Sequence, residues 1–111
     1  MPKLVRALAG LLLATGAPVA AEAHTAPSGF VYDSWCCGGR DCQPIPAEQV
    51  RITADGYLVT IPNGTHVTAH RDHSHLFHYD EVRFSGDGEY HACILPRSQE
   101  FRCLYVPRMG F

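Results

Sequence analysis

Three of the five cysteines fall within seven residues, at Cys36, Cys37 and Cys42, and this cluster most constrains what the chain can fold into. It lies in the stretch 32–46, which also holds the only tryptophan, Trp35, two consecutive glycines and two prolines. Neither a helix nor a sheet ladder tolerates that density of glycine and proline, so we predict an irregular loop here. Cross-links from such a loop can hold a short chain folded, but they specify no reaction.

The length of the chain, 111 residues, allows one small domain. A domain of this size buries too little apolar surface to be stable on its core alone, and disulfides are the usual remedy. An odd number of cysteines permits at most two disulfides within one chain, and the thiol left over could join two copies as a covalent homodimer. The disulfide candidates are Cys36, Cys37, Cys42, Cys93 and Cys103, and their spacing leaves the pairing open.

The first residues are typical of a secretory signal peptide. Two basic side chains precede an apolar run over 7–19, and Ala21-Glu22-Ala23 supplies the small-x-small pattern for cleavage before His24. The run is too short for a membrane anchor, and glycine and proline interrupt it. We therefore expect a signal peptide over 1–23 and a single small Cys-rich β domain over 24–111. We also expect a periplasmic or secreted location, with no membrane span after cleavage.

The charge of the expected exported domain excludes two classes of partner. Residues 24–111 contain seven arginines, no lysine and ten acidic residues, a formal charge of −3. A nucleic-acid-binding protein would present a basic patch, so no nucleic-acid partner is expected. The same balance argues against docking on anionic lipid.

Alternation of apolar and polar residues predicts a mostly β fold. Asp55-Gly56 between two such runs is a hairpin signal, and a second hairpin is expected across Ser85-Gly86-Asp87-Gly88. The predicted strands are 50–53, 57–61, 65–69, 81–84, 89–95 and 101–106, with a helical turn at 47–49 and a loop over 70–79. We expect a small disulfide-stapled antiparallel sheet or partly open barrel with an irregular Cys-rich N-terminal loop.

Two kinds of disulfide are compatible with this arrangement. Cys93 and Cys103 are symmetric about Ser98, so a hairpin would bring them face to face, and a bridge there would stabilise the fold by roughly 3 kcal/mol. A bridge from the N-terminal cluster to either one closes a far longer loop and is worth roughly 4 kcal/mol. We expect at least one long bridge. Without a Cys-x-x-Cys pair or a second close-set pair, structural disulfides are favoured over redox catalysis and thiolate metal binding.

Histidines are the one chemical anomaly, because five of the seven fall between residues 66 and 78. They are His66, His70, His73, His75 and His78. On a strand, His73 and His75 would share a face, whereas on a helical turn His75 and His78 would be neighbours. Such a group suits copper or zinc, although no cofactor is firmly implied. A solvated tract without a role and a pH sensor are the alternatives. His24, if exposed by cleavage, could also chelate copper with its amino group.

Catalytic patterns are weak. No serine lies in a nucleophile-elbow pattern. His91 precedes Cys93 by two residues, so the two would share a strand face, but we expect Cys93 to be bridged and His91 to be a packed or exposed strand residue. We therefore expect no enzyme activity.

The segments Cys36-Cys37 with Arg40-Asp41-Cys42, then Asp87-Gly88-Glu89-Tyr90-His91-Ala92-Cys93, then Cys103 and Pro107, resemble a group of small exported bacterial cysteine-rich proteins of unknown function. The resemblance implies that the five cysteines form a common framework, and it implies no activity, cofactor or partner. The histidine density over 66–78 departs from that pattern. We expect a binding or accessory protein for an unknown protein or small ligand; the alternative is a periplasmic copper- or zinc-binding protein.

Overall fold

The computed structural model describes residues 24–108, and the predicted signal peptide lies outside them. Within that range the chain is mostly β, as expected from the sequence pattern, and its strands form two sheets that do not close into a barrel. The strands are β1 (Cys42–Ile45), β2 (Val50–Thr53), β3 (Gly56–Ile61), β4 (His73–His78), β5 (Arg83–Ser85), β6 (Tyr90–Ile94) and β7 (Phe101–Pro107), and the 3-10 turns are η2 (Ala47–Gln49) and η3 (Tyr79–Glu81). No helix in this part of the chain is long and apolar enough to cross a membrane.

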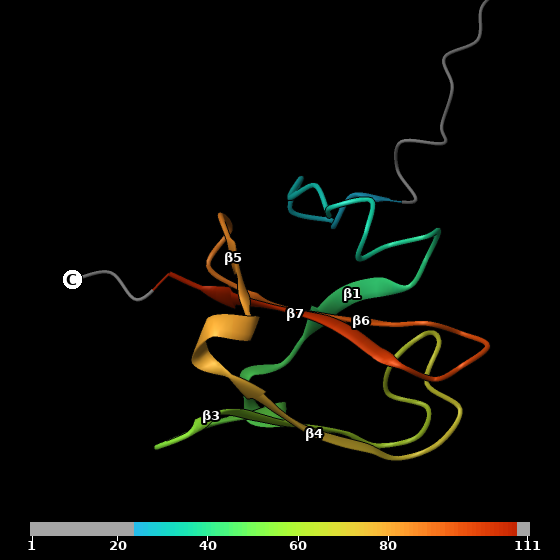
Figure 1. The fold of residues 1–111 in the computed structure, drawn as a ribbon. Coiled ribbons are helices and arrows are strands. Elements are labelled where there is room, and N and C mark those ends of the chain that lie inside the picture. The colour runs from blue at the N-terminus through green and yellow to red at the C-terminus, as the bar shows by residue number, and fades with distance from the viewer. Residues whose placement is uncertain (1–23, 109–111) are drawn as a thin grey trace, which may run out of the picture.

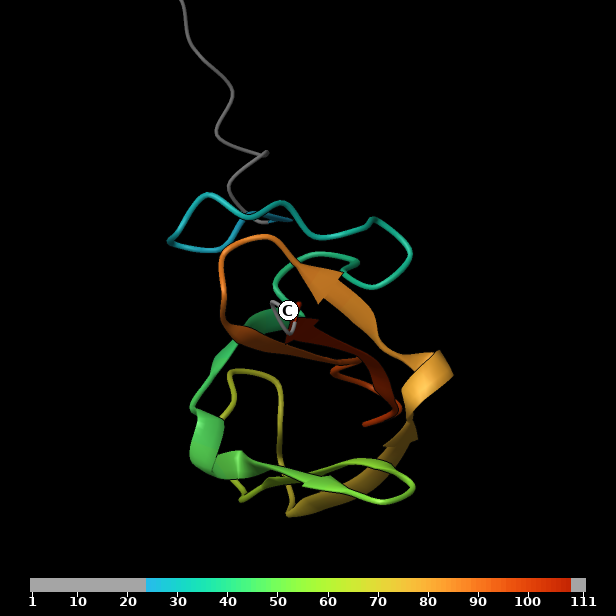
Figure 2. The ribbon, with the colours of Figure 1, turned by 90° about the vertical axis from the view of Figure 1, so that its left-hand side faces the viewer.

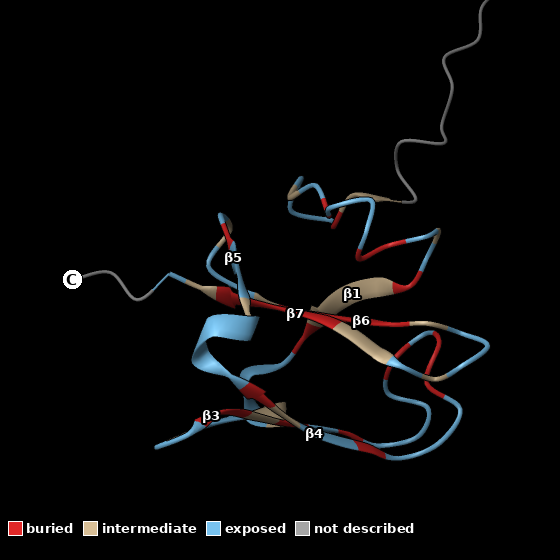
Figure 3. Cartoon of the chain, in the orientation of Figure 1, coloured by how far each residue is buried: buried red, intermediate tan, exposed pale blue. Residues whose placement is uncertain are grey.

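The fold has three layers, with a four-stranded sheet in the middle. Its strand order is β1-β6-β7-β5, and a second sheet of order β2-β3-β4 covers one face. The other face is covered by residues 24–41, here called the N-terminal arm (Figures 1 and 2). Side chains of a strand point alternately to the two faces, so β6 and β7 are covered on both sides and form a nearly continuous buried band (Figure 3).

Two apolar clusters correspond to the two faces of the middle sheet. Ala92 and Ile94 of β6, with Leu104 and Val106 of β7, face the second sheet and pack there against residues such as Val59. The intervening side chains of β6 and β7 face the arm. That second cluster contains Ala26, Tyr32, Cys36, Cys37, Cys93, Cys103 and Tyr105.

Both disulfides join the N-terminal cysteine cluster to the middle sheet. Cys36 bonds to Cys103 and Cys42 bonds to Cys93, at sequence separations of 67 and 51. Cys93 and Cys103 do lie opposite each other on β6 and β7, as the hairpin predicts, but each bonds to the cluster instead of to the other. The expectation of a long bridge is therefore confirmed.

The fifth cysteine, Cys37, belongs to the arm and is fully buried, and its thiol donates a hydrogen bond to the Gly39 carbonyl at 3.2 Å. A covalent homodimer through this residue stays a prediction. It would require Cys37 to leave its buried position.

The stretch 32–46 is only partly irregular, which corrects the loop prediction. Its last residues form β1, which pairs antiparallel with β6 in spite of Pro44. Proline is tolerated because β1 lies at the edge of the sheet, where a strand needs hydrogen bonds on one side only. The Cys42–Cys93 disulfide joins residues that are direct partners across these two strands.

The histidine segment was predicted wrongly, because the third strand of the second sheet is β4 and not 65–69. Residues 62–69 form tight turns, with Thr65 N–H donating to the Pro62 carbonyl and Ala69 N–H to the His66 carbonyl, each at 3.0 Å. β4 pairs with the whole of β3. Residues 73–78 do form a strand with alternating faces, but histidines occupy many of its positions. A search for alternating apolar residues therefore did not detect it.

The expected hairpin between 81–84 and 89–95 is also absent. β5 pairs instead with β7, and the two strands are parallel. The reason is geometric: a strand has two sides, and those of β6 are taken by β1 and by β7. By contrast, the Asp55-Gly56 hairpin is confirmed. Gly56 has a φ of +150°, and a Cβ there would collide with the Phe77 carbonyl of β4.

Candidate binding surface

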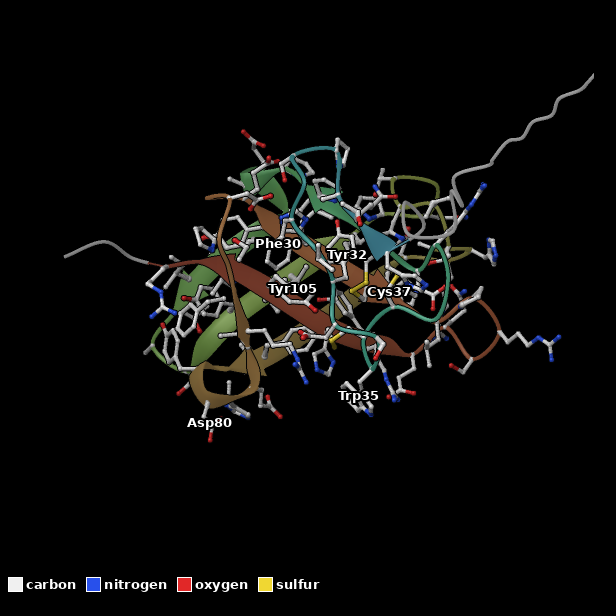
Figure 4. All side chains as sticks on the ribbon, turned by 90° about the horizontal axis from the view of Figure 1, so that it is seen from above. Phe30, Tyr32, Trp35, Cys37, Asp80 and Tyr105 are labelled. Carbon is white, nitrogen blue, oxygen red and sulfur yellow. A yellow bond between two sulfur atoms is a disulfide. The ribbon has the colours of Figure 1, made fainter. Side chains whose placement is uncertain are left out.

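Trp35 is presented to solvent by a rigid part of the arm. The Asp33 carbonyl accepts hydrogen bonds from the N–H groups of Cys36 and Cys37, both at 3.0 Å, which closes a tight turn around the tryptophan. The next residue is tied to β7 by the Cys36–Cys103 disulfide. Although held in this way, Trp35 remains 57% exposed. In Figure 4 it lies apart from the buried rings of the arm, at the rim of the molecule.

Two arginines from neighbouring strands flank the indole. The Arg102 guanidinium of β7 lies 3.7 Å from the ring centroid, and its Nε donates to the Trp35 carbonyl at 3.1 Å. The Arg83 guanidinium of β5 lies 5.5 Å from the same centroid. Contacts of this kind are cation–π interactions, and they fix the orientation of the ring as well as the position of the charged group. The parallel pairing of β5 with β7 places Arg83 opposite Tyr105, and Arg102 lies three residues earlier on β7.

Each arginine is itself paired with a carboxylate. Arg83 Nη1 lies 3.0 Å from Asp33 Oδ2, and Arg102 Nη1 lies 3.7 Å from Glu100 Oε2. Both carboxylate side chains are more than half exposed. We call these five residues the Trp35 surface: Asp33, Trp35, Arg83, Glu100 and Arg102.

Tyr105 anchors this surface from below. Its hydroxyl donates to Asp33 Oδ2 at 2.7 Å and accepts from the Asp33 N–H at 2.9 Å. Burial raises the pKa of Tyr105, with its hydrogen bond to the carboxylate adding to the effect, so the phenol keeps its proton and remains the donor. The turn that carries Trp35 is therefore fixed at both ends, by this tyrosine and by a disulfide.

A buried hydrogen-bond chain holds the rest of the arm on β6. The Tyr32 hydroxyl lies 2.8 Å from Nδ1 of His91, and Nε2 of His91 lies 2.9 Å from Asp87 Oδ2. Burial raises the pKa of Tyr32, so the phenol donates to Nδ1 and the ring donates its own proton to Asp87. The order resembles a catalytic relay, but a buried tyrosine with a raised pKa is the opposite of an activated nucleophile. The chain acts as a structural clamp.

His91 and Cys93 do not form a base–nucleophile pair, because the Cys93 sulfur is in a disulfide with Cys42. The sequence left open whether His91 is packed or exposed, and in the structure it is fully buried between the arm and the sheet. Asp87 makes the turn expected of an Asp-Gly pair, since its carboxylate accepts the Glu89 N–H at 3.0 Å. The same carboxylate also binds His91, which the sequence did not indicate.

Acid should weaken this clamp within a defined pH range. Burial raises the pKa of Asp87, but hydrogen bonds from Ser28, His91 and a backbone N–H outweigh it and lower the pKa from 3.8 to about 2. A carboxyl group with a lower pKa in the folded state stabilises the fold fully above its unfolded pKa and loses that contribution as the pH falls. We therefore expect the free energy of unfolding to decrease as the pH falls from about 4 to about 2. In D87N we expect this decrease to be smaller.

The measurement is urea denaturation at a series of pH values in that range. The control is D80N, because Asp80 is an exposed carboxylate of η3 that lies far from the arm in Figure 4. An equally steep acid loss in D87N and the wild type would contradict the assignment of Asp87.

His66 is a core residue in the structure. The Thr68 N–H donates to its Nδ1 at 3.2 Å, so the ring proton sits on Nε2 and is donated to the Ala92 carbonyl at 2.8 Å. Burial lowers the pKa of His66. The ring is neutral with both nitrogens occupied, and it offers no lone pair to a metal in this arrangement.

The remaining four histidines of the segment go to different places. His70 is exposed in the loop before β4. His73 and His75 share a face of β4, as expected for a strand, and His75 packs on Phe77 with ring centroids 4.5 Å apart. His78 ends β4 and is the N-cap of η3, where its N–H donates to the Glu81 carboxylate.

Across residues 24–108, no three His, Cys, Asp or Glu side chains form a group that could hold a metal ion. This range includes His24, whose carbonyl accepts the Tyr32 N–H within the arm. Binding of copper or zinc stays a prediction.

Gln99 is a structural residue that the sequence did not reveal. It adopts a φ of +61°, which is rare for a side chain other than glycine. Its amide donates to the Thr68 carbonyl at 2.7 Å, and its Oε1 accepts from the His70 N–H at 2.9 Å and from His73 Nε2 at 3.1 Å. These bonds tie the β6–β7 turn to the histidine segment, and they explain why His73 is buried.

The Trp35 surface was also missed, although Trp35 itself stood out as the only tryptophan. Its partners Arg83 and Arg102 are far away along the chain and reach it only through the sheet. When the chain was compared with protein-family models, curated proteins and solved structures, none matched. The functional assignment therefore depends on the residues of the site.

Proposed function

We propose that this protein is an exported, disulfide-stabilised binding or accessory module that recognises its ligand at the Trp35 surface and carries out no catalysis of its own. The observation that carries the proposal is a large aromatic side chain held rigidly and still 57% exposed. Tryptophan, tyrosine and arginine dominate the residues that supply most of the energy at binding interfaces.

Rigidity favours a binding role because ordering costs oppose association. A side chain that is already fixed before a ligand arrives loses little freedom when the ligand binds. Trp35 is fixed by a tight turn, by the neighbouring disulfide and by the Arg102 stack. Several interactions thus fix the position of a residue that is not part of the hydrophobic core.

Export is supported by the two disulfides, since such bonds persist in oxidising compartments. A non-catalytic role is supported by the state of the reactive groups. Cys93 is bridged, His91 is clamped between Tyr32 and Asp87, and His66 has both ring nitrogens occupied.

The variant W35A tests the proposal. Labelled wild-type protein and W35A would be applied to arrays of soluble oligosaccharides and of peptides. We expect the signals of the wild type to fall by at least about tenfold in W35A, which corresponds to the loss of one hot-spot side chain. Because Trp35 is exposed, we expect the thermal midpoint of W35A, followed by circular dichroism, to change little.

The matched control is V67A. Val67 is 59% exposed, about as much as Trp35, and lies in the loop between β3 and β4, outside the Trp35 surface. Signals that V67A keeps and W35A loses support the proposal. Signals that W35A keeps, or no signal for the wild type on either array, contradict it.

A further inference from the structure

We propose that the ligand of the Trp35 surface is an uncharged or weakly charged saccharide, with a sugar ring stacked on the indole. The inference rests on the proposed function and names its ligand class. It follows from three features of the surface: the exposure of the indole, the balance of its charges and the order of its groups before binding.

The indole has room for a stacked ring. Arg102 covers one face at 3.7 Å from the centroid, which is stacking contact. The Arg83 guanidinium also lies over the ring, but farther away, at 5.5 Å from the centroid. The residue nevertheless keeps 57% of its surface exposed, so part of the indole remains available for a stacked ring. The apolar C–H face of a pyranose ring fits such an aromatic platform.

The polar groups around the ring are balanced in charge and complementary in hydrogen bonding. Two guanidinium groups supply donors, and two carboxylates supply acceptors. A sugar hydroxyl both donates and accepts, so neighbouring hydroxyls can use both kinds of group. A polyanion would meet Asp33 and Glu100, and a polycation would meet Arg83 and Arg102. The surface thus penalises either sign and favours a neutral ligand.

The groups are also oriented before any ligand arrives. Asp33 Oδ2 already takes hydrogen bonds from Arg83 Nη1 and Tyr105, while the side chain remains about half exposed. Arg102 is held by its Nε bond to the Trp35 carbonyl and by the contact of its Nη1 with Glu100 at 3.7 Å. Saccharides gain little energy per contact, so a site for them depends on low ordering costs.

The test uses the fluorescence of Trp35, the only tryptophan of the chain. The disulfide-bonded protein would be titrated with cellohexaose and chitohexaose as neutral probes and with polyglutamate as the acidic probe. We expect a neutral probe to change the emission intensity and shift it to the blue. We also expect its affinity to change less than about twofold between roughly 0.05 and 0.5 M salt, because screening weakens only charge-driven binding.

Calorimetry with variants completes the test, since W35A has no tryptophan emission. We expect W35A to lose at least about tenfold in saccharide affinity, W35F to lose less because phenylalanine still offers a ring, and V67A to bind like the wild type. Saccharide binding that W35A keeps would overturn both the inference and the assignment of the site.

Two other outcomes separate the inference from the proposed function. If polyglutamate binds through Trp35 with steep salt dependence and the saccharides do not, the ligand class is wrong and the binding function stands. If none of the three probes binds while peptides on the array bind through Trp35, the saccharide inference is likewise overturned and a protein partner replaces it.

Discussion

Replacing Cys36 and Cys103 together by serine should lower the free energy of unfolding by about 4 kcal/mol, and so should replacing Cys42 and Cys93. A cross-link restricts the unfolded chain more as the loop it closes becomes longer, and these two bridges span 67 and 51 residues. Small domains are stable by only about 5–15 kcal/mol, so we expect the fourfold variant to be unfolded at physiological temperature. Urea denaturation followed by far-ultraviolet circular dichroism measures each loss.

Loss of each bridge should loosen a different part of the fold. Cys36 lies beside Trp35, so loss of the Cys36–Cys103 bridge should loosen the Trp35 surface and weaken ligand binding as well as stability. Cys42 and Cys93 also pair through β1 and β6, so loss of that bridge should leave Trp35 in place. The control is reductant, which should destabilise the wild type and leave the fourfold variant unchanged. Losses below about 1 kcal/mol for both pairs would show that the bridges do not carry the stability.

Replacing His91 by alanine should cost about 3 kcal/mol or more of folding free energy. His91 is fully buried between the arm and the middle sheet. Its removal leaves a cavity and also takes away the partner of the Tyr32 hydroxyl and one partner of the Asp87 carboxylate. The milder Y32F removes one hydrogen bond and keeps the packing, so we expect a loss of about 1 kcal/mol.

The measurement is urea denaturation of both variants, with limited proteolysis of the arm as a second readout. The control is H75A, because His75 is exposed on β4 and its loss should change stability by less than about 0.5 kcal/mol. If H91A and H75A lose similar amounts, the clamp contributes nothing. We expect the arm of H91A to be cleaved faster than that of H75A, since the clamp acts on the arm.

Local patterns predicted local structure well. The Asp55-Gly56 hairpin, the turn at 47–49 and the last strand all depend on neighbouring residues, and each appears where the sequence placed it. The long disulfides were favoured for an entropic reason that needs only the spacing along the chain. The sequence failed where pairing was decided at long range. β5 lies beside β7, and β4 replaces the strand expected at 65–69.

The candidate site shows the same division. The sequence by itself determined that the chain is a small β domain with enough cysteines for two disulfides. Composition, the alternation of apolar and polar residues, and the spacing of cysteines can all be read directly from the chain. Only the tertiary structure decided that Trp35 stays exposed beside Arg83 and Arg102, and that His91 joins Tyr32 to Asp87. It also dispersed five clustered histidines into core, strand and loop positions. Each of these outcomes depends on which strands and loops lie side by side, and packing free energy over the whole domain selects that arrangement.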